Sequence, residues 1–142
     1  MVNPTGSEAV RDVVGRLARA LDADDLEAAA RLLSDECVYE AGGETHRGPE
    51  AITASYAAAS ARAHRLFDDV RYESVIEAVA GDTATVTFID YLLKAGGLSH
   101  RHRCQQAFTV GPEGRITRIV HHDLPGEREA LAAFLRACGI EG

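Results

Sequence analysis

The first half of the chain carries apolar residues at helical spacing. They recur every three or four positions in residues 7–25 and 25–33, which predicts two helices with N-caps at Ser7 and Asp24. Pro49 stands where the first turn of a third helix, residues 49–63, would begin. Residues 37–41 predict a short strand, and residues 42–48 predict a loop. The residues expected to face inward are Val10, Val13, Val14, Leu17, Leu21, Leu26, Ala30, Leu33, Ile52, Tyr56 and Ala59.

The second half of the chain has the pattern of strands. Residues 70–79, 83–94, 98–110 and 115–124 are β-rich and are separated by the turn-forming stretches AGD, AGG and GPEG, as in an antiparallel meander. Residues 126–138 predict a closing helix with an apolar face. That face consists of Leu131, Phe134, Leu135 and Cys138. Helices followed by a meander predict an α+β domain, with helices packed on one face of a curved sheet.

The register of the meander follows from the lengths of its turns. We treat GPEG as a four-residue turn and AGG as a three-residue turn. The opposed pairs are then Val110–Arg115, Gln106–Ile119, Cys104–His121, His102–Asp123, Lys94–Leu98, Phe88–Cys104 and Asp90–His102. This map places the imidazole of His102 between two carboxylates, those of Asp90 and Asp123. A slip of one residue in either turn would break it.

One face of the meander changes from apolar to polar along its length. Opposed residues, and alternate residues of one strand, share a face. The face collects Ala84, Val86, Phe88, Asp90, His102, Cys104, Gln106, Phe108, Ile119, His121 and Asp123. Such a face either borders a small-molecule pocket or is a solvated surface with an idle polar network; the mixture of apolar and convergent polar groups favours the pocket. The opposite face, with Arg101 and Arg103, suits solvent or a dimer interface.

Composition narrows the class of protein. The 142 residues predict one domain over 1–142, with residues 1–6 disordered. A net charge of −7 argues against nucleic-acid binding, which needs clustered Lys and Arg. The sequence shows no membrane-spanning apolar run and no signal peptide, so we expect a cytoplasmic protein. Cys37, Cys104 and Cys138 lack the spacing of a disulfide framework or a zinc knuckle and read as buried free thiols.

Three motifs resemble the nuclear transport factor 2-like superfamily, particularly its ketosteroid isomerases and SnoaL-like polyketide cyclases. They are LDADDLEAAARLLSDECVYE, HRGPEAI and AFTVGPEGRITRI, and their order spans roughly residues 8–124. The resemblance implies a cone: a curved antiparallel sheet wrapped around N-terminal helices, with a C-terminal helix and a deep internal pocket. It also implies a cofactor-free protein that forms a homodimer through the outer face of the sheet.

The functional residues of these families transfer only in part. The isomerase positions for the Asp base, the Tyr donor and the Asp donor match Ala41, Leu17 and Gln106 here, so steroid isomerisation by that set of groups is not expected. Tyr56 matches a helix tyrosine that supports the isomerase pocket. His121 matches the acidic acid/base residue of SnoaL-like cyclases and retains a group that can transfer a proton.

The sequence therefore predicts an acid/base site. His121 is the first choice for general acid/base and His102 the second, with Asp90 or Asp123 orienting the imidazole. Gln106 and Tyr56 would donate hydrogen bonds to a developing oxyanion. The further residues expected to bind substrate are Tyr39, Phe88, Cys104, Leu17 and Ile119. The four acid/base residues are possible metal ligands, but without a compact ligand motif we expect no metal.

Two functions fit these predictions. The first is a cofactor-independent enzyme that transfers protons on a hydrophobic, cyclic or polyketide-like molecule, as a cyclase, isomerase, dehydratase or hydratase. The second is a non-catalytic module that uses the same cone to bind a ligand or to dimerise. The fold alone does not distinguish them. Changes at His121 that abolish a pH-dependent activity would favour the enzyme.

Overall fold

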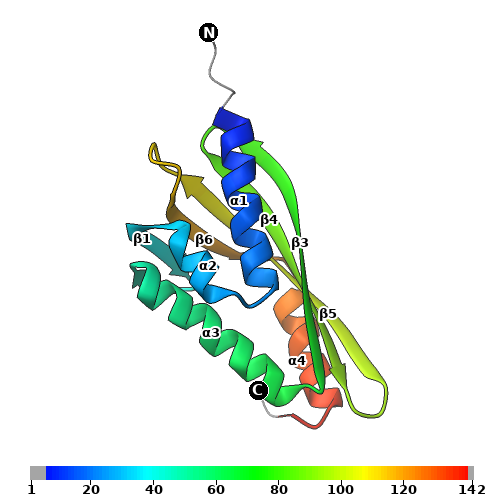
Figure 1. Cartoon of the computed structure of the whole chain (residues 1–142). Coiled ribbons are helices and arrows are strands. Elements are labelled where there is room, and N and C mark those ends of the chain that lie inside the picture. Colours follow the sequence, from blue (N-terminus) through cyan, green and yellow to red (C-terminus); the bar gives the residue numbers. More distant parts are fainter. Residues whose placement is uncertain (1–5, 141–142) are drawn as a thin grey trace.

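The computed structural model describes residues 6–140 and has the predicted α+β architecture. The helices are α1 (Gly6–Asp22), α2 (Leu26–Arg31), α3 (Pro49–Leu66) and α4 (Glu127–Ala137). The strands are β1 (Leu33–Ala41), β2 (Glu44–Arg47), β3 (Asp69–Ala80), β4 (Thr83–Lys94), β5 (Leu98–Val110) and β6 (Ile116–Asp123). The first three helices lie on one face of a curved sheet, and α4 lies near the end where β3, β4 and β5 extend beyond α1 (Figure 1).

The six strands form one sheet in the order β2-β1-β6-β5-β4-β3. All neighbouring strands are antiparallel except β1 and β6, which run parallel. The sheet is therefore mixed, although the four-strand meander is antiparallel as predicted. The parallel pair brings Tyr39 of β1 beside Ile119 of β6.

Several local predictions need correction at the N-terminal half. The helix α1 begins at Gly6, so Gly6 is ordered and Ser7 lies inside the first turn; residues 1–5 lie outside the described part of the chain. Asp25, not Asp24, caps α2, because its carboxylate accepts a hydrogen bond from the Ala28 N–H at 3.2 Å. Residues 44–47 form β2 instead of a loop, because the glycine-containing turn before them folds the chain back onto β1.

The meander has one hairpin as predicted and one that is shifted. The β4–β5 pairing places Asp90 opposite His102 and Phe88 opposite Cys104, which confirms that map. The β5–β6 turn has five residues instead of four: Val110 pairs with Ile116, and the N–H of Gly111 donates to the carbonyl of Arg115 at 2.8 Å. A β-bulge follows at residue 117, so the total shift is two residues.

The shift changes the neighbours of β6 but not its inward face. Gln106 lies opposite His121, and Cys104 lies opposite Asp123. The predicted pairs Gln106–Ile119, Cys104–His121 and His102–Asp123 are therefore wrong, and His102 does not sit between two carboxylates. Because side chains alternate with period two, a two-residue shift leaves the same residues on the concave face.

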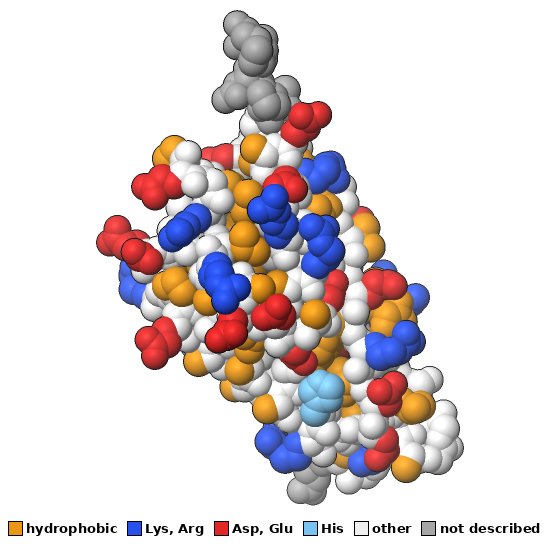
Figure 2. All heavy atoms as spheres, viewed as in Figure 1, with side chains coloured by type: hydrophobic (Ala, Val, Ile, Leu, Met, Phe, Trp, Pro, Cys, Tyr) orange, Lys and Arg blue, Asp and Glu red, His pale blue; other side chains and the backbone are white. Residues whose placement is uncertain are grey.

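Two apolar clusters stabilise the fold. The larger joins α1, α3 and the concave face of the sheet, with Leu17 and Ile119 at 1% and 0% exposure. The smaller joins α4 to the far ends of β3 and β4, through Phe134, Phe67, Val70 and Leu92. The predicted inner face of α4 is confirmed, since Leu131, Leu135 and Cys138 also pack there. The helix-covered surface mixes acidic, basic and apolar side chains (Figure 2).

We predict that Leu17→Ala lowers the free energy of unfolding by about 2–5 kcal/mol, because it leaves a cavity in the larger cluster. Chemical denaturation measures this change. Leu93→Ala is the matched control, because Leu93 is 42% exposed and its truncation is expected to cost less than about 1 kcal/mol. Equal losses in the two variants would contradict the placement of Leu17 in the core.

Candidate active site

A cavity of about 250 Å³ lies between the concave face of the sheet and α1, α2 and α3. It is lined by Leu21, Asp22, Asp24, Leu26, Tyr39, Tyr56, Ala59, Ser60, Ala63, Tyr72, Phe88, Asp90, His102, Cys104, Gln106 and His121. No lysine or arginine is among these residues. The cavity is therefore mostly apolar, with carboxyl, phenol and imidazole groups as its polar elements.

Strand pairing arranges the sheet side of the cavity in rows. One row runs Tyr72–Asp90–His102 across β3, β4 and β5. The next contains the less polar Phe88 and Cys104, and the one beyond it contains Gln106 and His121. The first and last rows are four positions apart along β5, which is about 13 Å at roughly 3.3 Å per residue. The cavity thus has two polar ends with an apolar middle.

Asp90 supplies the carboxyl group of the first row, and its pKa is strongly raised. Burial, and secondarily the charge of Asp22, raises the pKa of Asp90 to about 6. Asp22 stands at the C-terminal end of α1, and burial raises its pKa as well, partly offset by the Ser74 hydroxyl, which donates to Oδ2 at 2.6 Å. A carboxyl group with a pKa near 6 exchanges protons close to neutral pH, which suits general acid/base chemistry.

A second chain of hydrogen bonds adjoins Asp90 through Tyr72. The hydroxyl of Ser60 donates to Asp24 Oδ2 at 2.8 Å and lies 2.9 Å from the hydroxyl of Tyr72. Because a carboxylate only accepts and Ser60 has a single proton, Tyr72 is the donor to Ser60. Burial raises the pKa of Tyr72, so it stays a neutral phenol beside Asp90 at neutral pH.

Gln106 organises the other polar end. Tyr56 donates to Gln106 Oε1 at 2.6 Å, and Gln106 Nε2 lies 3.1 Å from the hydroxyl of Tyr39 and 3.2 Å from His121 Nδ1. The Tyr39 and Tyr56 rings stack with centroids 5.3 Å apart. Burial raises the pKa of Tyr39 to about 12 and that of Tyr56 well above its usual value, so both phenols keep their protons.

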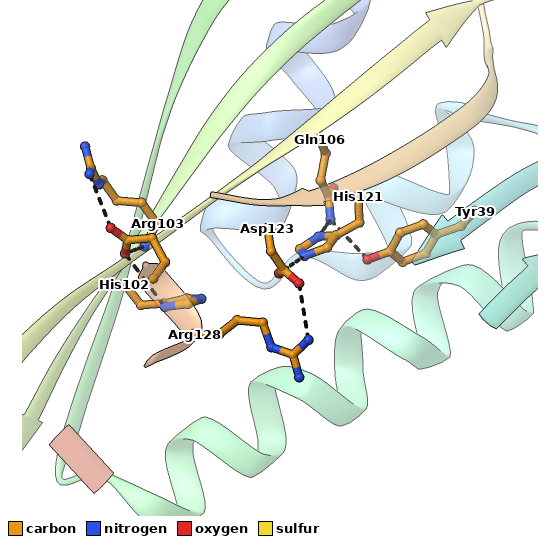
Figure 3. Close-up of polar contacts among 8 residues, drawn as sticks. Tyr39, His102, Arg103, Gln106, His121, Asp123 and Arg128 are labelled. Atoms are coloured by element: carbon orange, nitrogen blue, oxygen red, sulfur yellow. Dashed lines mark hydrogen bonds and ion pairs between the residues drawn. The ribbon is translucent and has the colours of Figure 1, made fainter. Parts of the chain in front are cut away.

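His121 is held at both ring nitrogens. Its Nε2 lies 3.0 Å from Asp123 Oδ1, and Asp123 Oδ2 lies 3.7 Å from Nη1 of Arg128 on α4 (Figure 3). With Gln106 donating to Nδ1, the ring is the neutral tautomer with a proton on Nε2. In this arrangement His121 has no free nitrogen to offer a substrate, which weakens its predicted role as the first-choice base.

His102 lies between the cavity and α4. Its Nδ1 is 3.9 Å from Glu127 Oε1, and that carboxylate accepts the backbone N–H of Arg103 at 2.8 Å (Figure 3). Burial lowers the pKa of His102, with Glu127 acting in the opposite direction, so the ring is neutral at neutral pH. The neighbouring His100 does not line the cavity; it stacks on Phe134 at 5.0 Å.

The cavity brings together most of the sheet residues that the sequence predicted for the site, and it adds Asp22 of α1, which the sequence did not predict. Asp90, His102, Cys104, Gln106, His121, Phe88, Tyr39 and Tyr56 all line the cavity, and Asp123 contacts it through His121. Leu17 and Ile119 are corrections: both are fully buried in the core and do not line the cavity. Asp22 and Tyr72 were missed; the helix-ending acidic run after Leu21 was the available signal for Asp22.

Neither a cysteine nucleophile nor a metal site receives support from the geometry. Burial raises the pKa of the Cys104 thiol to about 12, which makes it a poor nucleophile at neutral pH. Among residues 6–140, no cluster of three or more histidine, cysteine or acidic side chains is arranged to hold a metal ion. Within the same residues, no helix combines the length and apolar character needed to cross a membrane.

Comparison with known families agrees with this fold. The family model of the SnoaL-like domain matches residues 14–119, so the chain belongs to the SnoaL-like domain family. This also confirms the resemblance to the nuclear transport factor 2-like superfamily. A search of curated proteins gives no match to this chain.

Solved structures share the fold at low sequence identity. A candidate polyketide cyclase from Sinorhizobium meliloti is 25% identical, with a TM-score of 0.63 over 78% of this chain and 94% of that one. A candidate polyketide cyclase from Xanthomonas campestris pv. campestris is 17% identical, with a TM-score of 0.68 over 92% and 99%. An LEH-like epoxide hydrolase of M. tuberculosis is 23% identical, with a TM-score of 0.64 over 92% and 95%.

We predict that Asp90→Asn raises the free energy of unfolding relative to wild type. This gain is expected to be about 2–3 kcal/mol larger at pH 7 than at pH 4. The folded-state pKa of Asp90 is raised from 3.8 to about 6, so its contribution to stability is fully present below pH 3.8 and lost as the pH rises through 6. Denaturation of both proteins at several pH values measures the difference. A difference independent of pH would show that Asp90 titrates as an ordinary exposed carboxyl.

Proposed function

We propose that the protein is a cofactor-independent enzyme that abstracts and returns a proton on a compact, mostly apolar molecule. Asp90 is the acid/base group, and the proton it moves is attached to a carbon next to a carbonyl group. This chemistry needs no bound cofactor, only a base with a matched pKa and a site that excludes water. The SnoaL-like fold and the candidate cyclases among its structural neighbours support a small-molecule enzyme.

One observation carries this proposal: the Asp90 carboxyl lines an apolar cavity with a pKa of about 6. Tyr72 and His102 flank it in the same row and are neutral, so neither neutralises its charge. In its ionised form Asp90 is poorly solvated and therefore a stronger base than an exposed carboxylate. His121, the first choice from the sequence, lies instead at the far end of the cavity, where it contacts Asp123.

The far end anchors a second oxygen of the substrate. The Tyr39 hydroxyl accepts from Gln106, and no acceptor for its own proton occurs among residues 6–140. Tyr39 lines the cavity, so this proton is available to a carbonyl or hydroxyl oxygen of the substrate. Substrates with oxygens at both ends and an apolar centre match the two polar ends of the cavity.

Exchange of carbon-bound protons with deuterated solvent tests the reaction without knowledge of the product. With 1-tetralone as probe, we expect mass spectrometry to show enzyme-dependent deuterium uptake whose kcat/KM rises with pH to a plateau above about 6. Asp90→Asn is expected to lower the rate at least about 100-fold, a typical loss for a general base. Asp35→Asn, on the exposed side of β1, is the matched control and is expected to retain the wild-type rate.

Two results would contradict the proposal. Exchange that is equal in wild type and Asp90→Asn would remove Asp90 from the reaction. Tight binding of the probe without any exchange would favour the non-catalytic ligand-binding module.

A second prediction concerns the anchoring end. Tyr39→Phe is expected to raise the KM for 6-hydroxy-1-tetralone about tenfold and to change kcat less than about threefold, because a hydrogen bond to the distant oxygen is lost. The same variant is expected to leave the KM for 1-tetralone unchanged, since that probe lacks the distant oxygen. A loss confined to kcat would instead place Tyr39 at the reacting atoms.

A further inference from the structure

The number of available protons limits which hydrogen bonds can form around Gln106. The amide of Gln106 offers two N–H donors, used by Tyr39 and His121 Nδ1, and one oxygen, which accepts from Tyr56. Each phenol has one proton. In this state the Tyr56 hydroxyl donates its proton in a hydrogen bond to Gln106, whereas the Tyr39 hydroxyl can donate its proton to a ligand in the cavity.

The same heavy-atom positions allow a second pattern. If the Gln106 amide turns by 180°, its nitrogen faces Tyr56 and its oxygen faces Tyr39 and His121. The amide then donates to Tyr56 and accepts from the Tyr39 hydroxyl and from a proton on His121 Nδ1. In the second state Tyr39 is engaged, and the proton of Tyr56 is the free one. Tyr56 also lines the cavity.

We propose that Gln106 is a protonation-coupled switch: it turns when His121 takes up a second proton, and it thereby exchanges Tyr39 for Tyr56 as the hydroxyl donor facing the cavity. The proposal goes beyond the reaction at Asp90, because it concerns which group binds the far oxygen. Its role in turnover rests on the function proposed above, whereas the switch itself is a property of the unliganded protein.

Protonation of His121 forces the turn because two donors cannot face each other. A protonated ring carries N–H groups on both nitrogens. Nε2–H keeps Asp123 as its acceptor in either state, at 3.0 Å, but Nδ1–H would meet the N–H of Gln106. Gln106 is only 4% exposed, so the clash is largely shielded from bulk water. A buried donor without an acceptor costs about 1–3 kcal/mol, and turning the amide removes the cost.

The groups around His121 come from four elements. Asp123 on β6 binds the ring, and Arg128 on α4 contacts the same carboxylate at 3.7 Å. On β5, His102 and Cys104 line the same cavity, with His121 adding to the positive electrostatics around His102. Tyr39 on β1 completes the set, and burial keeps its phenol neutral at neutral pH. Asp123 is thus the acceptor for the ring, and Arg128 is the charged group on the far side of that carboxylate.

Nuclear magnetic resonance of the unliganded protein tests the switch directly. At high pH we expect the nitrogen shifts of His121 to report a neutral ring with its proton on Nε2. As the pH falls, the side-chain NH₂ signals of Gln106 are expected to move with the same midpoint as the His121 ring signals. Gln106 signals that do not respond to His121 protonation, or a neutral ring protonated on Nδ1, would overturn the proposal.

Two variants on one strand separate the switch from a general charge effect. Gln106→Glu replaces the amide by a group that accepts only, so we expect His121 to carry a proton on Nδ1 at pH 7.5. Gln105→Glu is the matched control on the opposite face of β5, where Gln105 donates to Thr87 at 3.0 Å. It is expected to leave the His121 signals as in wild type. An equal response in both variants would contradict a switch located at Gln106.

The wild-type titration needs no variant and decides the proposal even if Gln106→Glu does not fold. It also needs no substrate, so its outcome is independent of proton transfer at Asp90. An intact switch together with absent deuterium exchange would overturn the proposed function and keep the inference. Deuterium exchange together with Gln106 signals that do not respond to pH would support the proposed function and overturn the switch.

Discussion

The alternation of side chains along β5 is the constraint on which the site depends. Every second residue of a strand faces the same side, so a sequence of mixed polarity is divided into two surfaces. His102, Cys104 and Gln106 enter the cavity, while Arg101 and Arg103 remain exposed on the convex face. Pairing with β4 then adds Asp90 to the same row as His102, and pairing with β6 adds His121 beside Gln106. Backbone pairing thereby places groups from distant parts of the chain together.

Burial, and not attraction between opposite charges, controls the chemistry of the cavity. No lysine or arginine lines it among the described residues, so the carboxyl groups of Asp90 and Asp22 lack a permanently charged cation there. Desolvation therefore raises both pKa values, with smaller contributions from the charge of Asp22 on Asp90 and from the charge of Glu73 on Asp22. Burial also raises the pKa values of Tyr39 and Tyr56, so both phenols stay protonated. One physical effect thus supplies a base at one end and neutral hydrogen-bond donors at the other.

Sequence reasoning predicted the elements and the concave face, because periodicity and turn residues are local signals. The β4–β5 register was correct because the AGG turn has no bulge, whereas the β5–β6 register failed because turn length and the bulge at residue 117 are not encoded by a local pattern. Because the error in the β5–β6 register was two residues, the predicted side chains of β6 still lie on the concave face. Asp22 and Tyr72 were not predicted as site residues, because their positions depend on how α1 and β3 pack across the sheet. The partners of His121 could not be predicted for a related reason: Gln106 and Asp123 contact its two ring nitrogens only because the fold brings them near.

The most direct test of this account is a carbon-13 titration of the Asp90 carboxyl group in the folded protein. The account predicts a midpoint at about pH 6, and a lower midpoint in Asp22→Asn because a neighbouring negative charge is removed. A midpoint near 4 in wild type, unchanged in Asp22→Asn, would show a well-solvated carboxyl. In that case the cavity would hold no base tuned to neutral pH, and the central claim would be wrong.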